Sequence, residues 1–90
     1  MEKINSSVSY EIKNNSISFK IIDKYFSPYE IFEIINKSYS DNFDIKEIED
    51  LKNKMKKEFI DLKNNLKIEE YPFTILIEVK NKKFIFQKVC

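Results

Sequence analysis

The stretch from Asp44 to Leu66 most constrains the fold, because it predicts one long amphipathic helix over residues 45–66. On a helical wheel its apolar residues fall within an arc of about 100°, the width of a core-facing stripe. These residues are Ile45, Ile48, Met55, Phe59, Leu62 and Leu66. Asp44 and Glu47 have the spacing of a capping box, which marks the start of a helix. We therefore expect a rod of roughly 33 Å, long enough to cross a small sheet.

The two edges of this apolar stripe differ in charge. Lysines follow one edge and carboxylates follow the other, namely Lys52, Lys56, Lys63 and Lys67 against Glu47, Asp50, Glu58 and Asp61. The simpler interpretation is that lysine stems cover apolar surface while their ammonium groups stay in water. The alternative is that one charged edge contacts a partner molecule.

Alternating apolar and polar residues before and after the helical region predict two β-hairpins. The first is expected over residues 3–22, with one strand over 4–13 and a turn at Asn14-Asn15. A two-residue loop there sets on one face the pairs Val8–Ile21, Tyr10–Phe19 and Ile12–Ile17. The second hairpin is expected over residues 73–89, with its turn at Asn81-Lys82. Its register pairs Val79 with Phe84 and Ile77 with Phe86.

A shorter helix is predicted over residues 28–38, because Ser27 suits the cap position and Pro28 suits the first turn. The element order is therefore ββααββ. The economical fold is an α+β domain, in which a two-layer arrangement places both helices on one face of a four-stranded antiparallel sheet. Residues 1–90 are expected to form a single domain, and the order of the strands in the sheet stays open.

The residue types missing from the chain exclude most catalytic chemistry. Without histidine there is no Ser-His or Cys-His nucleophile pair and no imidazole metal ligand. Without glycine there is no P-loop and no dinucleotide-binding fingerprint. Cys90 alone cannot form a zinc site or an internal disulfide, which fits a reducing compartment. We therefore expect no enzymatic activity, no catalytic residues, no metal and no cofactor.

Composition also limits the cellular compartment and the classes of partner that we expect for the protein. No apolar run approaches about 18 residues, and the N-terminal segment has no apolar signal core, so we expect a cytoplasmic protein without membrane contact. Ala and Arg are absent while Lys, Ile and Asn abound, which is typical of an AT-rich genome. Because that bias supplies lysine freely, and because the net charge is only +1, composition does not favour a dedicated duplex binder.

Three surfaces are candidates for binding a partner. One is the lysine edge of the long helix, extended by lysines of the last hairpin, which include Lys80, Lys82, Lys83 and Lys88. Another is the outer face of that hairpin, where Leu76 and Ile85 are diagonal neighbours, although a dimer partner or the N-terminal segment would explain this apolar pair equally well. A third is strand addition at an edge of the sheet.

These features favour a small non-catalytic protein-binding domain. The most concrete hypothesis is an accessory or inhibitor protein of a bacterium or phage, of the immunity or anti-defence (anti-CRISPR-like) type, that binds a larger enzyme or nucleoprotein. It rests on chain size and missing chemistry, because the residues indicate no known family. The alternatives are a nucleic-acid-binding protein that uses the lysine edge and a homodimeric structural subunit that pairs through the second hairpin.

Overall fold

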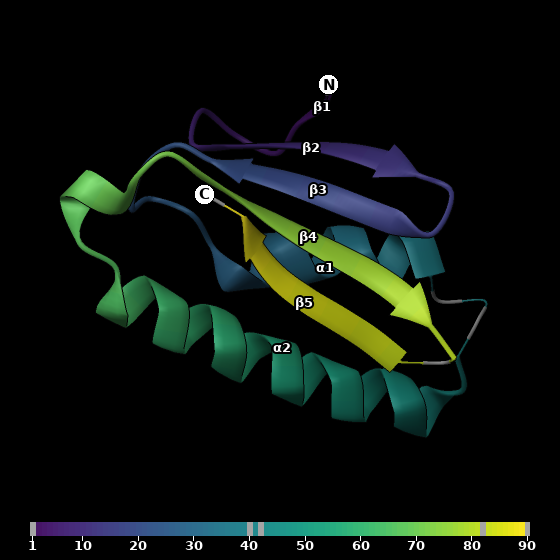
Figure 1. Ribbon diagram of the computed structural model, residues 1–90. Coiled ribbons are helices and arrows are strands. Elements are labelled where there is room, and N and C mark those ends of the chain that lie inside the picture. Colours follow the sequence, from purple (N-terminus) through teal and green to yellow (C-terminus); the bar gives the residue numbers. More distant parts are fainter. Residues whose placement is uncertain (1, 40, 42, 82, 90) are drawn as a thin grey trace. The chain divides into compact units, whose positions relative to one another are not determined.

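A computed structural model of the chain describes residues 2–39, 41, 43–81 and 83–89 (Figure 1). The chain forms two compact units, a sheet unit of Met1–Phe26 and Lys67–Cys90 and a helical unit of Ser27–Leu66. The four predicted strands and two predicted helices are present in the order ββααββ, so the small α+β fold is confirmed. The placement of both helices on one face of the sheet stays a prediction.

The sheet unit is an antiparallel sheet in which the strands lie side by side in chain order (Figure 1). The strands are β1 (Glu2–Lys3), β2 (Val8–Lys13), β3 (Ser16–Ile21), β4 (Phe73–Lys80) and β5 (Lys83–Val89). The sequence left the strand order open. Pairing of β3 with β4, which sets Ile17 opposite Ile77, joins the two predicted hairpins into one sheet.

The registers predicted for both hairpins are confirmed. Ile12 lies opposite Ile17 in the first hairpin, and Val79 lies opposite Phe84 in the second. A slip of one residue would move every apolar side chain to the other face, and this cost is what fixes each register. Asn81 has a φ of 54°, a left-handed conformation that asparagine tolerates in tight turns. Lys82, the second residue of the predicted turn, lies outside the described residues, as does Cys90.

The prediction of one continuous strand over residues 4–13 was wrong, because residues 4–7 form a turn. The side-chain Oδ1 of Asn5 accepts hydrogen bonds from the backbone N–H groups of Ser7 and Val8, at 2.7 and 3.1 Å. The chain reverses there, and β1 pairs with β2 so that Lys3 lies opposite Ser9. An asparagine side chain that bonds nearby backbone groups competes with strand pairing, and the apolar alternation did not reveal this competition.

One face of the sheet, called the inner face below, is apolar and buried. Its buried residues are Val8, Ile17, Phe19, Ile21, Phe73, Ile75, Ile77 and Phe84. Because successive side chains of a strand point to opposite faces, the alternation in the sequence gathers all of them on one side. Each such residue contributes roughly 1.5–3 kcal/mol by leaving water. These side chains form part of the buried core, so we look for a partner-binding surface on the opposite, outer face.

In the helical unit, α1 (Pro28–Tyr39) and α2 (Ile45–Asn65) contact each other. The predicted capping box of α2 is confirmed: the Asp44 carboxylate accepts from the Glu47 N–H at 2.8 Å, and the Asp44 N–H donates to Glu47 Oε1 at 3.1 Å. At the start of α1, Ser27 Oγ accepts from the Glu30 N–H at 3.5 Å. Both helices end within one residue of the predicted positions.

Burial along α2 is confined to the middle of the predicted apolar stripe. Met55 and Phe59 are fully buried, while Ile48 and Leu62 are half-buried. Ile45 is 85% exposed, so its prediction as a core residue was wrong. Ile45 is exposed because it is the first residue of α2, and the helix extends beyond the segment around Met55 and Phe59 that is buried.

Candidate partner-binding surface

The outer face of the sheet differs between its two halves. The half formed by β2 and β3 carries only polar residues, namely Ser9, Glu11, Lys13, Ser16, Ser18 and Lys20. The half formed by β4 and β5 mixes apolar and polar residues, namely Thr74, Leu76, Glu78, Ile85, Gln87 and Val89. The apolar group on β4 and β5 therefore stands out from the rest of this face.

Three residues on this half, Leu76, Ile85 and Val89, form what we call the β4–β5 patch. Leu76 lies opposite Gln87, which makes Ile85 and Val89 its diagonal neighbours on the same face. Diagonal neighbours lie roughly 7–8 Å apart, within reach of long side chains. Ile85 is 44% exposed and Val89 is 41% exposed, and Leu76 is half-buried. The predicted proximity of Leu76 and Ile85 is thus present, and the sequence interpretation missed the part that Val89 plays.

Two lysines stand beside the patch at the tip of the second hairpin. Lys80 and Lys83 lie directly opposite each other, and both are exposed. Like charges directly opposite on neighbouring strands are destabilising in an isolated sheet. An anionic group placed between them would remove this repulsion. The two-residue turn already implied this pairing in the sequence, where both lysines were named as candidates for the basic surface.

The β4–β5 patch lies at the border of the sheet. Within the described residues, β5 has β4 as its only neighbouring strand, and it is seven residues long. The opposite border is formed by β1, which has only two residues. A long edge strand is a template on which a partner strand can pair, whereas a very short one limits such pairing.

The fourth hairpin lysine considered as an extension of the basic surface, Lys88, lies on the inner face. It is opposite Ile75, which is fully buried there. Its Nζ is 3.6 Å from Glu70 Oε1 and 5.3 Å from the centroid of the Phe73 ring. Lys88 is therefore engaged within the sheet unit and lies on the opposite face from Lys80 and Lys83, while its part in an extension of the basic helix edge stays a prediction.

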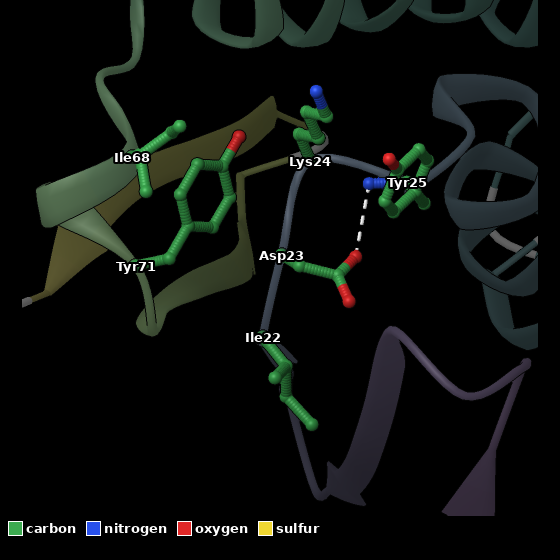
Figure 2. A pocket seen from close by; sticks show the side chains of 6 residues that line it. All are labelled: Ile22, Asp23, Lys24, Tyr25, Ile68 and Tyr71. Carbon is green, nitrogen blue, oxygen red and sulfur yellow. Dashed lines mark hydrogen bonds between the residues drawn. The ribbon is translucent and has the colours of Figure 1, made fainter.

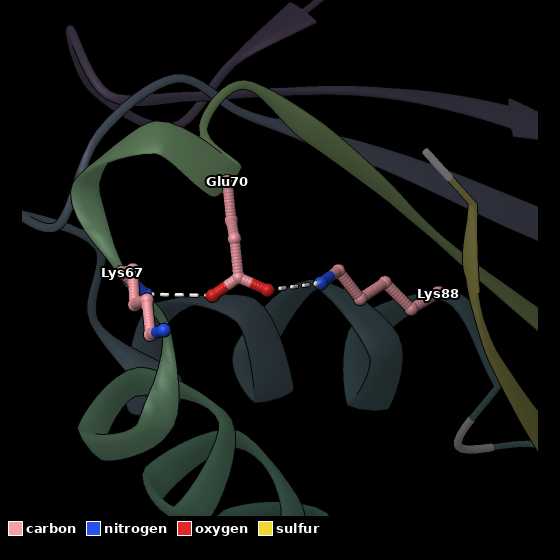
Figure 3. Close-up of polar contacts among 3 residues, drawn as sticks. All are labelled: Lys67, Glu70 and Lys88. Atoms are coloured by element: carbon pink, nitrogen blue, oxygen red, sulfur yellow. Dashed lines mark hydrogen bonds and ion pairs between the residues drawn. The ribbon is translucent and has the colours of Figure 1, made fainter.

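Glu70 connects Lys88 to the short 3-10 helix η2 (Ile68–Glu70) that precedes β4. Glu70 Oε2 accepts a hydrogen bond from the Lys67 backbone N–H at 2.7 Å, as Figure 3 shows. This hydrogen bond is the main cause that lowers the pKa of the Glu70 carboxyl, and the charges of Lys88 and Lys67 add to it.

The predicted lysine edge of the long helix is only partly realised. Lys52 and Lys56 are half-buried, and Lys63 is exposed. Lys56 Nζ lies 4.3 Å from the centroid of the Tyr29 ring, so a cation–π contact holds this ammonium group within the helical unit. Lys67 follows the helix, beyond its cap residue Leu66, and is not a fourth position of the helical stripe.

The described residues contain no group of three or more acidic, histidine or cysteine side chains that could hold a metal ion. In that same part of the chain, no helix combines the length and the apolar character needed to cross a membrane. No protein-family model, curated protein or solved structure matches this chain.

Proposed function

We propose that this chain is a non-catalytic protein-binding domain that contacts its partner through the β4–β5 patch. One observation carries the proposal: an exposed apolar group lies on an otherwise polar outer face, at the border of the sheet. Single exposed aliphatic residues are ordinary on protein surfaces. A contiguous apolar group with a polar rim is instead typical of a contact site.

The charges beside the patch specify the partner further. Lys80 and Lys83 stand opposite each other, so a partner surface with a carboxylate next to an apolar centre fits best. A nucleic acid would also meet these lysines, but the apolar side chains of Leu76, Ile85 and Val89 would gain little from a phosphate backbone. Hence an acidic protein surface is favoured over nucleic acid.

The free energies involved favour a partner strand that pairs along β5, in addition to side-chain contact with the β4–β5 patch. Covering the remaining exposed surface of three partly exposed aliphatic side chains contributes roughly 1 kcal/mol each. A micromolar complex requires about 8 kcal/mol. Main-chain hydrogen bonds from a strand added to the edge of the sheet are a source for the difference, with the patch supplying specificity.

The biological role we propose is that of an accessory or inhibitor protein in the cytoplasm of a bacterium or of a phage host. Acting by stoichiometric binding, it would block a larger enzyme or nucleoprotein, in the manner of an immunity or anti-defence protein. The support for this role is the small size of the chain and its lack of histidine and glycine, which removes histidine-dependent nucleophile pairs and glycine-rich phosphate-binding loops.

A matched pair of substitutions tests the binding surface. The partner is isolated by affinity capture and purified, and its affinity is measured for Ile85→Ser and Ile12→Ser. Both isoleucines are about half exposed, but Ile12 lies on the inner-face register of the first hairpin, away from the patch. We expect Ile85→Ser to weaken binding about tenfold and Ile12→Ser to leave it unchanged. Equal losses in both variants would overturn the assignment of the surface.

Two further measurements separate the alternatives. Micromolar binding to DNA or RNA, with an affinity that falls steeply as salt rises, would identify nucleic acid and not a protein as the partner. A sedimentation mass of two chains at about 100 µM, reduced to that of one chain by Ile85→Ser, would identify a second copy of this chain as the partner. The proposal predicts neither result.

A further inference from the structure

A pocket of about 300 Å³ lies in the sheet unit, between the chain that leaves β3 and the chain that enters β4. Its lining residues are Ile22, Asp23, Lys24, Tyr25, Ile68 and Tyr71 (Figure 2). The Asp23 carboxylate accepts a hydrogen bond from the Tyr25 backbone N–H at 2.9 Å, and the Lys24 ammonium lies 5.3 Å from the Tyr25 ring centroid. Both charged groups are engaged within their own segment, so we assign no ligand to the pocket. The border strand β5, in contrast, presents an ordered row of charged and apolar side chains.

The side chains of β5 alternate between exposed and covered positions. Those on the outer face are all exposed, namely Lys83, Ile85, Gln87 and Val89. The intervening side chains point to the inner face and are buried or half-buried. Because successive residues of a strand point to opposite faces, a strand added along β5 would place half of its side chains beside the exposed row. The row therefore selects what such a strand must carry.

The hydrogen bonds of β4 fix which backbone groups of β5 point outward. The Val79 N–H donates to the Asn15 C=O at 2.9 Å, so it points toward β3 and away from β5. Hydrogen-bonded and non-hydrogen-bonded pairs alternate along an antiparallel ladder, so Ile85 and the other outer-face residues of β5 direct their backbone groups to β4. The residues between them direct theirs away from β4. Beside an added antiparallel strand, Ile85 and Val89 therefore take non-hydrogen-bonded positions, where side chains lie closest.

We propose that the partner adds an antiparallel strand beside β5, with a carboxylate next to Lys83 and aliphatic side chains next to Ile85 and Val89. This inference rests on the proposed function, because it concerns the same patch, and it adds the orientation and the residue pattern of the partner strand. In the partner sequence the acidic residue follows the two aliphatic residues by two and by six positions. From its N-terminus the partner strand therefore has the pattern aliphatic-x-x-x-aliphatic-x-acidic.

The charge and the orientation have separate physical reasons. Lys83 and Lys80 repel each other across the hairpin, and a carboxylate beside Lys83 offsets that repulsion. Leu76, the third member of the β4–β5 patch, lies diagonal to both Ile85 and Val89, so the two aliphatic positions of the partner meet a continuous apolar group. Antiparallel pairing continues the arrangement of the described sheet, and it is slightly more stable per residue than parallel pairing.

A second copy of β5 fits this pattern poorly. Antiparallel pairing of two β5 strands over their full length would set Lys83 of one copy beside Val89 of the other. Ile85 of one copy would lie beside Gln87 of the other, and this register would leave Lys83 beside an apolar side chain in place of a carboxylate. A different protein with an acidic strand is therefore favoured over self-association.

The test uses a seven-residue peptide of this pattern, acetyl-Val-Thr-Thr-Thr-Ile-Thr-Glu-amide, which matches the length of β5. The peptide is titrated into the full chain by NMR, as are its reversed sequence and a form with lysine in place of glutamate. We expect a dissociation constant on the order of 1 mM. The reversed peptide is expected to bind about threefold more weakly and the lysine peptide about fivefold more weakly. Equal affinity of the original and reversed peptides, or no saturable shift by about 10 mM, would overturn the proposal.

Contacts between backbone protons show the orientation and register of the bound peptide. In a non-hydrogen-bonded antiparallel pair the two Cα atoms lie about 4.5 Å apart, which brings their protons close enough for a strong nuclear Overhauser effect. We expect this effect between Ile85 and the peptide isoleucine and between Val89 and the peptide valine. The effect between Ile85 and the peptide valine would instead contradict the register.

A charge reversal tests the acidic position. In Lys83→Glu we expect the lysine peptide to bind about fivefold more tightly than the glutamate peptide. Lys13→Glu, on the polar half of the outer face, is the matched control and is expected to keep the original preference. An unchanged preference in Lys83→Glu would overturn the assignment of a carboxylate beside Lys83.

The peptides and the captured partner distinguish failure of this inference from failure of the proposed function. If the peptides do not bind while Ile85→Ser still weakens the captured partner more than Ile12→Ser does, strand pairing is wrong and the binding surface stands. If the peptides bind as expected while both isoleucine variants bind the captured partner equally, β5 accepts a strand of this pattern but the proposed function fails.

Discussion

Glu70 in η2 and Lys88 on β5 form an ion pair, with 3.6 Å between Oε1 and Nζ. The same carboxylate accepts the Lys67 backbone N–H at 2.7 Å. One side chain thus ties the segment that enters β4 to the strand at the border of the sheet (Figure 3). Both contacts favour the ionised carboxylate, so they couple this end of the sheet unit to pH.

The first prediction concerns this pH dependence. The pKa of Glu70 in the folded chain lies below its ordinary value of 4.5. Its stabilising contribution is therefore complete above that value and is lost as pH falls through the lower, folded pKa. We expect Glu70→Gln to lower the urea midpoint slightly at neutral pH and to converge with the unsubstituted chain in acid. Glu69→Gln, which removes the neighbouring exposed charge, serves as the control, and an equal shift in both variants would argue against the specific contacts.

The second prediction concerns the start of α2. Asp44→Ala removes the acceptor for the Glu47 N–H and is expected to cost about 1 kcal/mol of unfolding free energy. Asp44→Asn retains an acceptor at the cap and is expected to cost much less. The measurement is urea denaturation followed by far-ultraviolet circular dichroism. Equal destabilisation by the two substitutions would attribute the effect to charge and not to the cap.

The third prediction separates the buried and exposed parts of the α2 stripe. Met55 is fully buried, so Met55→Ala is expected to cost roughly 2–5 kcal/mol through lost burial and a cavity. Ile45 is 85% exposed, so Ile45→Ala is expected to change stability by less than about 0.5 kcal/mol. Chemical denaturation of both variants checks the pair. A large loss of stability in Ile45→Ala would instead support the uniformly buried stripe that the sequence periodicity predicted.

The fourth prediction links stability to binding at the hairpin tip. Lys83→Glu replaces repulsion with attraction toward Lys80 and is expected to stabilise the chain by about 0.3 kcal/mol at low salt, less at high salt. The same substitution is expected to weaken binding of an acidic partner. Lys13→Glu, on the polar half of the outer face opposite Ser16, is the matched control. Tighter partner binding by Lys83→Glu would contradict the acidic-partner assignment.

Local patterns explain how much of this fold was predictable. The period of two and the two-residue turns fixed which residues pair within each hairpin, and the capping residues fixed the helix starts. The turn at Asn5 was missed because a side-chain hydrogen bond, and not hydrophobic periodicity, decides it. Pairing of Ile17 with Ile77 joins residues far apart in the chain, and no local signal specifies it.

The same distinction explains the candidate sites. The apolar pair Leu76 and Ile85 could be predicted, because it depends on the register of one hairpin. The pocket with Asp23 and Tyr71 could not, because it exists only once β3 pairs with β4. The lysine edge as a partner-binding surface stays a prediction, and helical spacing alone does not show that Lys56 contacts Tyr29.

The most direct test of the proposed function is site-specific photo-cross-linking in host cells. A photoreactive residue replaces Gln87, which lies opposite Leu76 within the patch, or Glu11, which lies on the polar half of the same face. Both positions are exposed. The proposal predicts one discrete protein adduct from position 87, absent from position 11 and lost when Leu76→Ser and Ile85→Ser are added. Equal adducts at both positions, or adducts with nucleic acid alone, would contradict it.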